Sequence, residues 1–206
     1  MLVFTRLATI LFFVLSLGFV VSALPTAASD SNELVARDGS NDLKTLVINL
    51  KADVDVCINT IGAILSVVTQ NKPNINIAGL TASADVSAQI DVLVGKINTC
   101  ATAVLALGSN IDINASVQAD VAVKVGAIIT AIVQLGLSLS AKFGSLVALG
   151  LFAKIDVCLA ALLTNLNICV GGIISLITKA VGNISVNIFA NIHLGLCAHV
   201  LGLINP

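Results

Sequence analysis

The sequence lacks tryptophan and tyrosine, and only 10% of its 206 residues are charged. Four of its seven phenylalanines lie within the first twenty residues, which leaves Phe143, Phe152 and Phe189 for the rest of the chain. So few rings exclude an aromatic platform for stacking bases or sugars. The net charge of -1 gives no positive patch for nucleic acid. Because 57% of the residues are hydrophobic, a disordered chain is excluded too.

Motifs for catalysis are also missing. The chain has no glycine-rich phosphate loop, no Gly-x-Ser-x-Gly elbow and no His-Glu-x-x-His helix. His193, Cys197 and His199 are close in sequence, but no fourth metal ligand is nearby. Asp53 and Asp55 would face different sides of a helix, which argues against an acid–base pair. We therefore predict a protein that is not an enzyme and binds no metal or cofactor.

The amino terminus resembles a secretory signal. One positive charge at Arg6 precedes an apolar run from Leu7 to Val21, and Val21–Ala23 has the small residues of a signal-peptidase site. We predict a signal peptide at 1–23, with cleavage after Ala23. The alternative is a retained membrane anchor, for which the run is short. Cleavage would make the protein secreted, in the extracellular space or the cell wall.

A short leader and one domain are expected after the signal. Residues 24–40 show no periodicity and predict a flexible leader or propeptide, with Arg37 as a candidate processing site. Residues 41–206 are predicted to form one helical domain. Its front half is more polar, and its back half is charge-poor and apolar. Val157–Thr178 contains no charge, so an integral membrane protein is an alternative.

Helical periodicity dominates the predicted domain. Apolar residues recur every three or four positions, which places them on one face of a helix. Turn-forming residues interrupt the pattern at 71–74, 108–110 and 181–183. We predict an all-α, antiparallel bundle of about five amphipathic helices. The alternation at 111–125 and 183–194 leaves short strands as an alternative. The clearest stripes are Val86, Ile90, Leu93, Ile97, Ala101 and Val104, and then Val121, Val125, Ile128, Ile132 and Leu135.

Five cysteines follow the signal, and an exported protein matures where disulfides persist. Cys158 and Cys169 would lie about 16 Å apart on one helix, too far for a disulfide. A hairpin turning near residue 74 would let Cys57 meet Cys100, and a turn near residue 182 would let Cys169 meet Cys197. We therefore expect a disulfide-stapled bundle with Cys158 as a free, buried thiol. An odd cysteine also leaves self-association open.

Two acceptor triplets for N-glycosylation point to the same compartment. They are Asn114-Ala115-Ser116 and Asn183-Ile184-Ser185. We expect glycans at Asn114 and Asn183 in a secreted glycoprotein.

The signal ending at Val21–Ala23, a leader containing Leu34–Asp38 and the aromatic-poor helical body resemble small secreted fungal proteins. Two groups share this organisation. One is the hydrophobic-surface-binding protein A family, whose helical members adsorb to apolar solids. The other is a mushroom cell-wall protein type with a hydrophilic front half and a hydrophobic back half, which supports aerial hyphae without hydrophobin. The resemblance covers the mature chain and carries no individual functional residues.

Three functional hypotheses follow. The first is a secreted, non-enzymatic surface-active or cell-wall-associated structural protein whose helices open at hydrophobic interfaces. Its partners would be hydrophobic surfaces, cell-wall components or lipids, and not nucleic acid. The second is a secreted lipid or sterol carrier with an aliphatic pocket. The third is an integral membrane protein.

Overall fold

The computed structural model describes residues 39–70 and 75–204, and every regular element in these ranges is a helix. The all-α prediction is therefore confirmed, and the strand alternative for 111–125 and 183–194 is wrong. The predicted signal peptide, its cleavage site after Ala23, and the leader up to residue 38 lie outside the described residues. The helices are α2 (Gly39–Gln70), α3 (Ile75–Ala106), α4 (Ala115–Phe143), α5 (Ser145–Cys169), α6 (Ile173–Ala180), α7 (Val186–Asn191) and α8 (Gly195–Val200).

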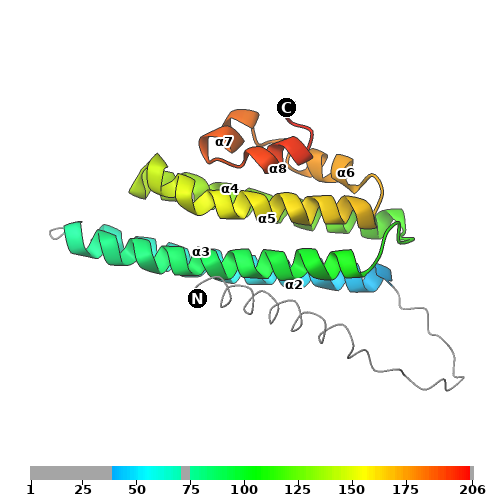
Figure 1. Ribbon diagram of the computed structural model, residues 1–206, viewed down its shortest axis with the longest axis horizontal. Helices are drawn as coiled ribbons and strands as arrows, with labels where there is room; N and C mark the ends of the chain where they lie inside the picture. The colour runs from blue at the N-terminus through cyan, green and yellow to red at the C-terminus, as the bar shows by residue number, and fades with distance from the viewer. Residues whose placement is uncertain (1–38, 71–74, 205–206) are drawn as a thin grey trace, which may run out of the picture. The chain divides into compact units, whose positions relative to one another are not determined.

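These helices pack in three layers (Figure 1). The antiparallel pair α2 and α3 forms one layer, and the antiparallel pair α4 and α5 packs on it, with α4 against α2 and α5 against α3. The short helices form the third layer, in which α6 contacts α4 and α8 contacts α5. Instead of about five similar helices, the described chain therefore has four long helices and a layer of short ones.

The two predicted stripes form the core of the bundle. Every residue of both stripes is buried, because each stripe faces the opposite helix pair. α4 begins where the Asn114 side chain accepts a hydrogen bond from the Val117 N–H, a typical N-cap. It ends at Gly144, whose φ of +85° permits the tight turn into α5. Both ends of α4, and the start of α5, are thus set by a cap and a glycine.

The chain after α5 breaks into short helices for local reasons. Gly172 has a φ of +78° and lies directly before α6. The predicted turn at 181–183 separates α6 from α7, and His193 has a φ of +60° between α7 and α8. The left-handed residues Gly172 and His193 interrupt helical hydrogen bonding at the first and the last of these points. The segment therefore folds back onto the bundle and does not extend past it.

The expected disulfide between Cys57 and Cys100 is wrong. Both cysteines are free, and no cysteine pair in the described chain lies at disulfide distance. The Cys100 Sγ is 3.8 Å from the Leu46 carbonyl oxygen, so Cys100 packs beside a part of α2 eleven residues before Cys57. Eleven helical residues span about 16 Å, whereas a disulfide needs Cα atoms within about 7 Å. The register of the hairpin keeps the two thiols apart.

The expected disulfide between Cys169 and Cys197 is wrong for a similar reason. Cys169 is the last residue of α5. The Cys197 N–H donates a hydrogen bond to the carboxylate of Asp156. Asp156 precedes Cys169 by thirteen residues on α5. That separation corresponds to about 20 Å along the helix. Cys158 is also a free, buried thiol, so the bundle is not disulfide-stapled and rests on its apolar core.

Two helices have the length and composition of membrane spans. They are α4 and the Val147–Cys169 part of α5. Core helices of soluble proteins meet the same criteria, because they too are long and apolar. In this fold both helices pack against neighbours on more than one side.

Candidate functional site

The outward side of α5 has almost no charge. Its exposed residues recur at helical spacing over about five turns. Val157 is 59% exposed, although it is an aliphatic residue in the middle of the helix. Lys154 lies at the edge of this side, where its Nζ pairs with the Asp91 carboxylate of α3. We call the following residues the outer face of α5: Leu149, Gly150, Ala153, Val157, Ala161, Thr164, Asn167 and Ile168.

Most ion pairs involve the layer formed by α2 and α3. Within the described ranges, every ion pair but one includes a residue of α2 or α3. The exception is Lys124–Asp120 within α4, and Asp120 also pairs with Lys44 of α2. Two lysines, Lys44 and Lys124, hold the Asp120 carboxylate, and their hydrogen bonds lower its pKa. The fold therefore separates a charged α2–α3 layer from an α5 side whose one charged residue is Lys154 at its edge. The other pairs are Lys51–Asp55, Lys96–Asp53 and Lys154–Asp91.

One buried carboxylate fastens α8 to α5. Asp156 is 6% exposed and is the one charged residue in the core of the described chain. Its Oδ2 accepts the Leu196 N–H at 2.9 Å and its Oδ1 accepts the Cys197 N–H at 2.8 Å. These are amides of the first turn of α8, which lack partners inside that helix. Burial raises the Asp156 pKa, and the two N–H groups oppose that shift only in part.

Two glycines of α4 let the third layer approach closely. A Cβ at Gly126 would lie 2.7 Å from the Ala180 Cβ of α6. A Cβ at Gly136 would lie 3.1 Å from the Ile192 Cβ, directly after α7. Because real Cβ atoms do not approach closer than about 3 Å, any other residue at position 126 would push α6 away. The close packing of the third layer on α4 therefore depends on glycine, which has no side chain, at positions 126 and 136.

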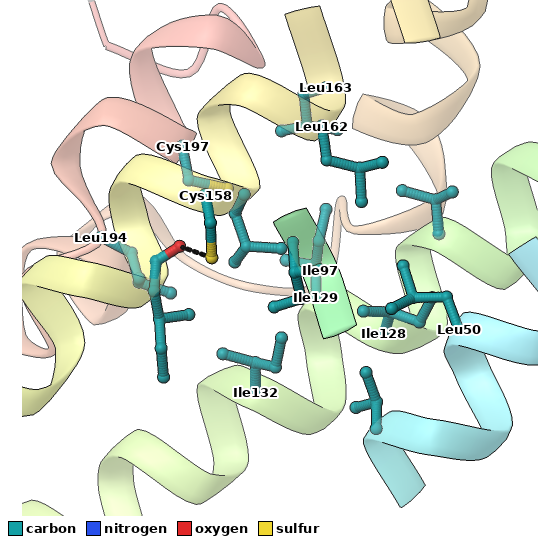
Figure 2. Close-up of a cluster of buried hydrophobic side chains, with 14 of the residues drawn as sticks. Leu50, Ile97, Ile128, Ile129, Ile132, Cys158, Leu162, Leu163, Leu194 and Cys197 are labelled. Atoms are coloured by element: carbon teal, nitrogen blue, oxygen red, sulfur yellow. Dashed lines mark hydrogen bonds between the residues drawn. The ribbon is translucent and has the colours of Figure 1, made fainter. Parts of the chain in front are cut away.

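The third layer packs apolar side chains against α4 and α5. Figure 2 shows Leu194 and Cys197 in one cluster with Leu162 and Leu163 of α5 and Ile132 of α4. A further tie joins α6 to the end of α8, since the Thr178 Oγ1 donates to the Leu201 carbonyl at 2.8 Å. The residues after α6 that this arrangement buries are Val181, Phe189, Ile192, Leu194, Cys197, Ala198 and Leu201.

The buried thiols are poor nucleophiles. Burial raises the pKa of Cys100 to about 11 and those of Cys158 and Cys197 to about 12. The pKa values of Cys57 and Cys169 are raised by burial as well. The Cys158 Sγ also donates to the Ile155 carbonyl, the dashed line in Figure 2. Because the thiolate is the reactive form, these cysteines act as small core side chains at neutral pH.

The histidine–cysteine set does not come together as a metal site. Cys197 is completely buried, whereas His199 is exposed and His193 is half-buried. Among the described residues, no three histidine, cysteine or acidic side chains are placed to hold a metal ion.

Both glycosylation triplets lie on the surface. Asn114 and Asn183 are exposed, and Asn114 has the second role of capping α4. Its Oδ1 accepts hydrogen bonds from the Val117 N–H and the Ser116 hydroxyl, while its Nδ2 is the atom that a glycan would occupy. The cap and the modification therefore use different atoms of one side chain.

Sequence reasoning missed two groups that organise this region. Asp156 is the only acid between residues 125 and 206, and its isolation in an apolar sequence was the signal that could have marked it. Gly126 and Gly136 lie inside an apolar helical stripe, where a glycine indicates close packing.

Comparison with known proteins adds no relative. No protein-family model matches the chain, and no curated protein matches it.

Proposed function

We propose that this protein is a secreted, non-enzymatic surface-active or cell-wall-associated protein that acts at hydrophobic interfaces. The observation that supports it best is the outer face of α5, which runs the length of a long helix with aliphatic and small residues exposed to water. Contact with an apolar phase would remove that face from water. Each Å² of apolar area removed contributes about 25 cal/mol.

The segregation of charge supports the same proposal. An adsorbing protein needs one side that prefers the apolar phase and another that stays hydrated. Here the ion-paired layer of α2 and α3 is hydrated, and the outer face of α5 lies in the neighbouring layer. The two sides differ in charge although both belong to one folded unit, so adsorption does not require complete unfolding.

The test compares two exposed valines. Val157 on α5 is 59% exposed and Val56 on α2 is 65% exposed, so they are matched in size and accessibility. Surface pressure at a clean air–water interface is followed for the purified protein and for Val157→Lys and Val56→Lys. We expect the unmodified protein and Val56→Lys to raise the surface pressure at similar rates, and Val157→Lys to raise it several-fold more slowly.

Two results would count against the proposal. A wild-type protein that leaves surface tension unchanged would remove surface activity altogether. Equal slowing by the two substitutions would show that the outer face of α5 is not the contacting side.

A further inference from the structure

The segment from Val186 to Ile204, with α7 and α8, covers apolar surface of α4 and α5. We call it the α7–α8 cover. Its two helices have six residues each, and helices this short are not stable without packing partners. Their folded state therefore depends on contact with α4, α5 and α6, and loss of that contact would release the segment as a unit.

The cover is tied down by few polar bonds. Asp156 accepts two amides of the first turn of α8, and Thr178 donates to Leu201 at its end. Among the described residues, the other contacts that hold the cover are apolar, including Ile192 against Gly136. Apolar packing can be replaced by an apolar phase at little cost, because the same side chains leave water in either case. The polar ties cannot be replaced in that way.

The cover is poor in charge; its buried side is apolar, and its outer side exposes apolar residues beside polar ones. The residues from Val157 to Ile204 include no acid. On its outer side Leu196 is 51% exposed and Val186 is 37% exposed. Its underside buries Phe189, Ile192 and Leu194 completely.

We propose that the α7–α8 cover is a releasable element, held closed on α5 by the Asp156 carboxylate, and that its release at a hydrophobic interface adds the apolar surface beneath it to the outer face of α5. This inference rests on the proposed function, and it names the element that changes and the residue that restrains it. α6 stays on α4, where Ala180 packs directly against Gly126.

Hydrogen exchange of the whole chain in solution tests the restraint without any interface. Asp156→Ala leaves both α8 amides without their acceptor, and Thr178→Val removes the second tie at nearly constant volume. Asp55→Ala is the control, because it removes an exposed carboxylate from α2. We expect Asp156→Ala to speed exchange in residues 192–203 by about tenfold or more. Amides of α2 and α3 should be unchanged, and Asp55→Ala should leave residues 192–203 unaffected.

Thr178→Val should speed exchange in the same residues to a smaller extent, and it carries the test if Asp156→Ala does not fold. Unchanged exchange at 192–203 in a folded Asp156→Ala protein would overturn the proposal. So would equal acceleration along the whole chain, which would mean that the cover does not move separately.

Exchange of protein adsorbed on polystyrene beads separates this inference from the proposed function. We expect the adsorbed protein to lose protection from exchange in the cover alone. We also expect Asp156→Ala to adsorb faster than Asp55→Ala. If the protein adsorbs while residues 192–203 stay protected, the cover is not released, and the proposed function stands. If nothing adsorbs, the proposed function fails, and with it the role of release.

Discussion

Gly126 of α4 and Ala180 of α6 touch almost backbone to backbone: a Cβ added at Gly126 would lie 2.7 Å from the Ala180 Cβ. This contact fixes the distance between the third layer and the bundle. It also makes α4 a helix with one side specialised for close packing, because Gly136 repeats the arrangement against Ile192. Both glycines are buried.

Gly126→Ala is expected to destabilise the protein. The added methyl group overlaps Ala180, and overpacking of this kind costs about 1–3 kcal/mol. Gly62→Ala is the matched control: Gly62 is exposed in α2, and nothing lies within 4 Å of its added Cβ. That substitution should stabilise the protein by about 0.5–1 kcal/mol, since alanine is the better helix former. Urea unfolding of both variants measures the two changes in the free energy of unfolding. If both substitutions changed it in the same direction, the close contact at Gly126 would be contradicted.

The absence of disulfides among the described cysteines predicts insensitivity to reductant. All five are free and buried. The thermal midpoint should therefore be the same with and without dithiothreitol. Alkylation with iodoacetamide in denaturant, without prior reduction, should add five groups by mass, whereas native protein should react slowly. A lower midpoint in reductant, or fewer than five groups in denaturant, would show a bond that this structure does not contain.

Asp156 predicts a specific pH dependence. Burial raises its pKa in the folded state, so the folded protein binds this proton more tightly than the unfolded chain does. The pH-dependent part of its contribution to stability is full below the ordinary value of 3.8 and is lost as pH rises through the raised pKa. The groups facing it are the Cys158 and Cys197 thiols, with pKa values of about 12, and they stay neutral in this range.

The measurement is the free energy of unfolding of wild type minus that of Asp156→Ala, from pH 3 to 7. Subtraction cancels the other carboxyls, including Asp120 with its opposite shift. We expect the difference to decrease as pH rises. Because release of the α7–α8 cover hydrates Asp156, the same shift favours release at higher pH. A difference that grows with pH would mean that the two N–H groups outweigh burial.

Asn114 allows the helix cap and the glycan to be separated. Asn114→Ala removes the acceptor for the Val117 N–H and should cost about 1 kcal/mol. Asn114→Asp keeps an oxygen acceptor and should preserve most of the stability. In protein secreted from a eukaryotic host, both variants should lose the same glycan mass. Equal stability of the two variants would contradict the cap, and unchanged mass would show that the triplet is not used.

Sequence alone predicted the helices because helix formation is decided by neighbours within a few residues. The stripes from Val86 to Val104 and from Val121 to Leu135 have the spacing of one helical face, and all of their residues are buried. The breaks at 108–110 and 181–183 followed from local turn residues for the same reason, whereas the turn at Gly144 was not predicted. The cysteine pairs failed because they depend on register. A helix carries Cys57 about 16 Å away from the level of Leu46, where Cys100 packs, and no local pattern states which residues face each other.

The amino-acid sequence by itself determined that this protein is helical, poor in charge and divided into a polar front and an apolar back, since each property depends on composition and short-range spacing. Only the tertiary structure decided that α5 exposes a face without charge, that Asp156 binds the start of α8, and that Gly126 packs against Ala180. Each of these joins residues at least forty positions apart, or depends on which side of a helix its neighbours cover, and such contacts are set by the packing of the whole chain.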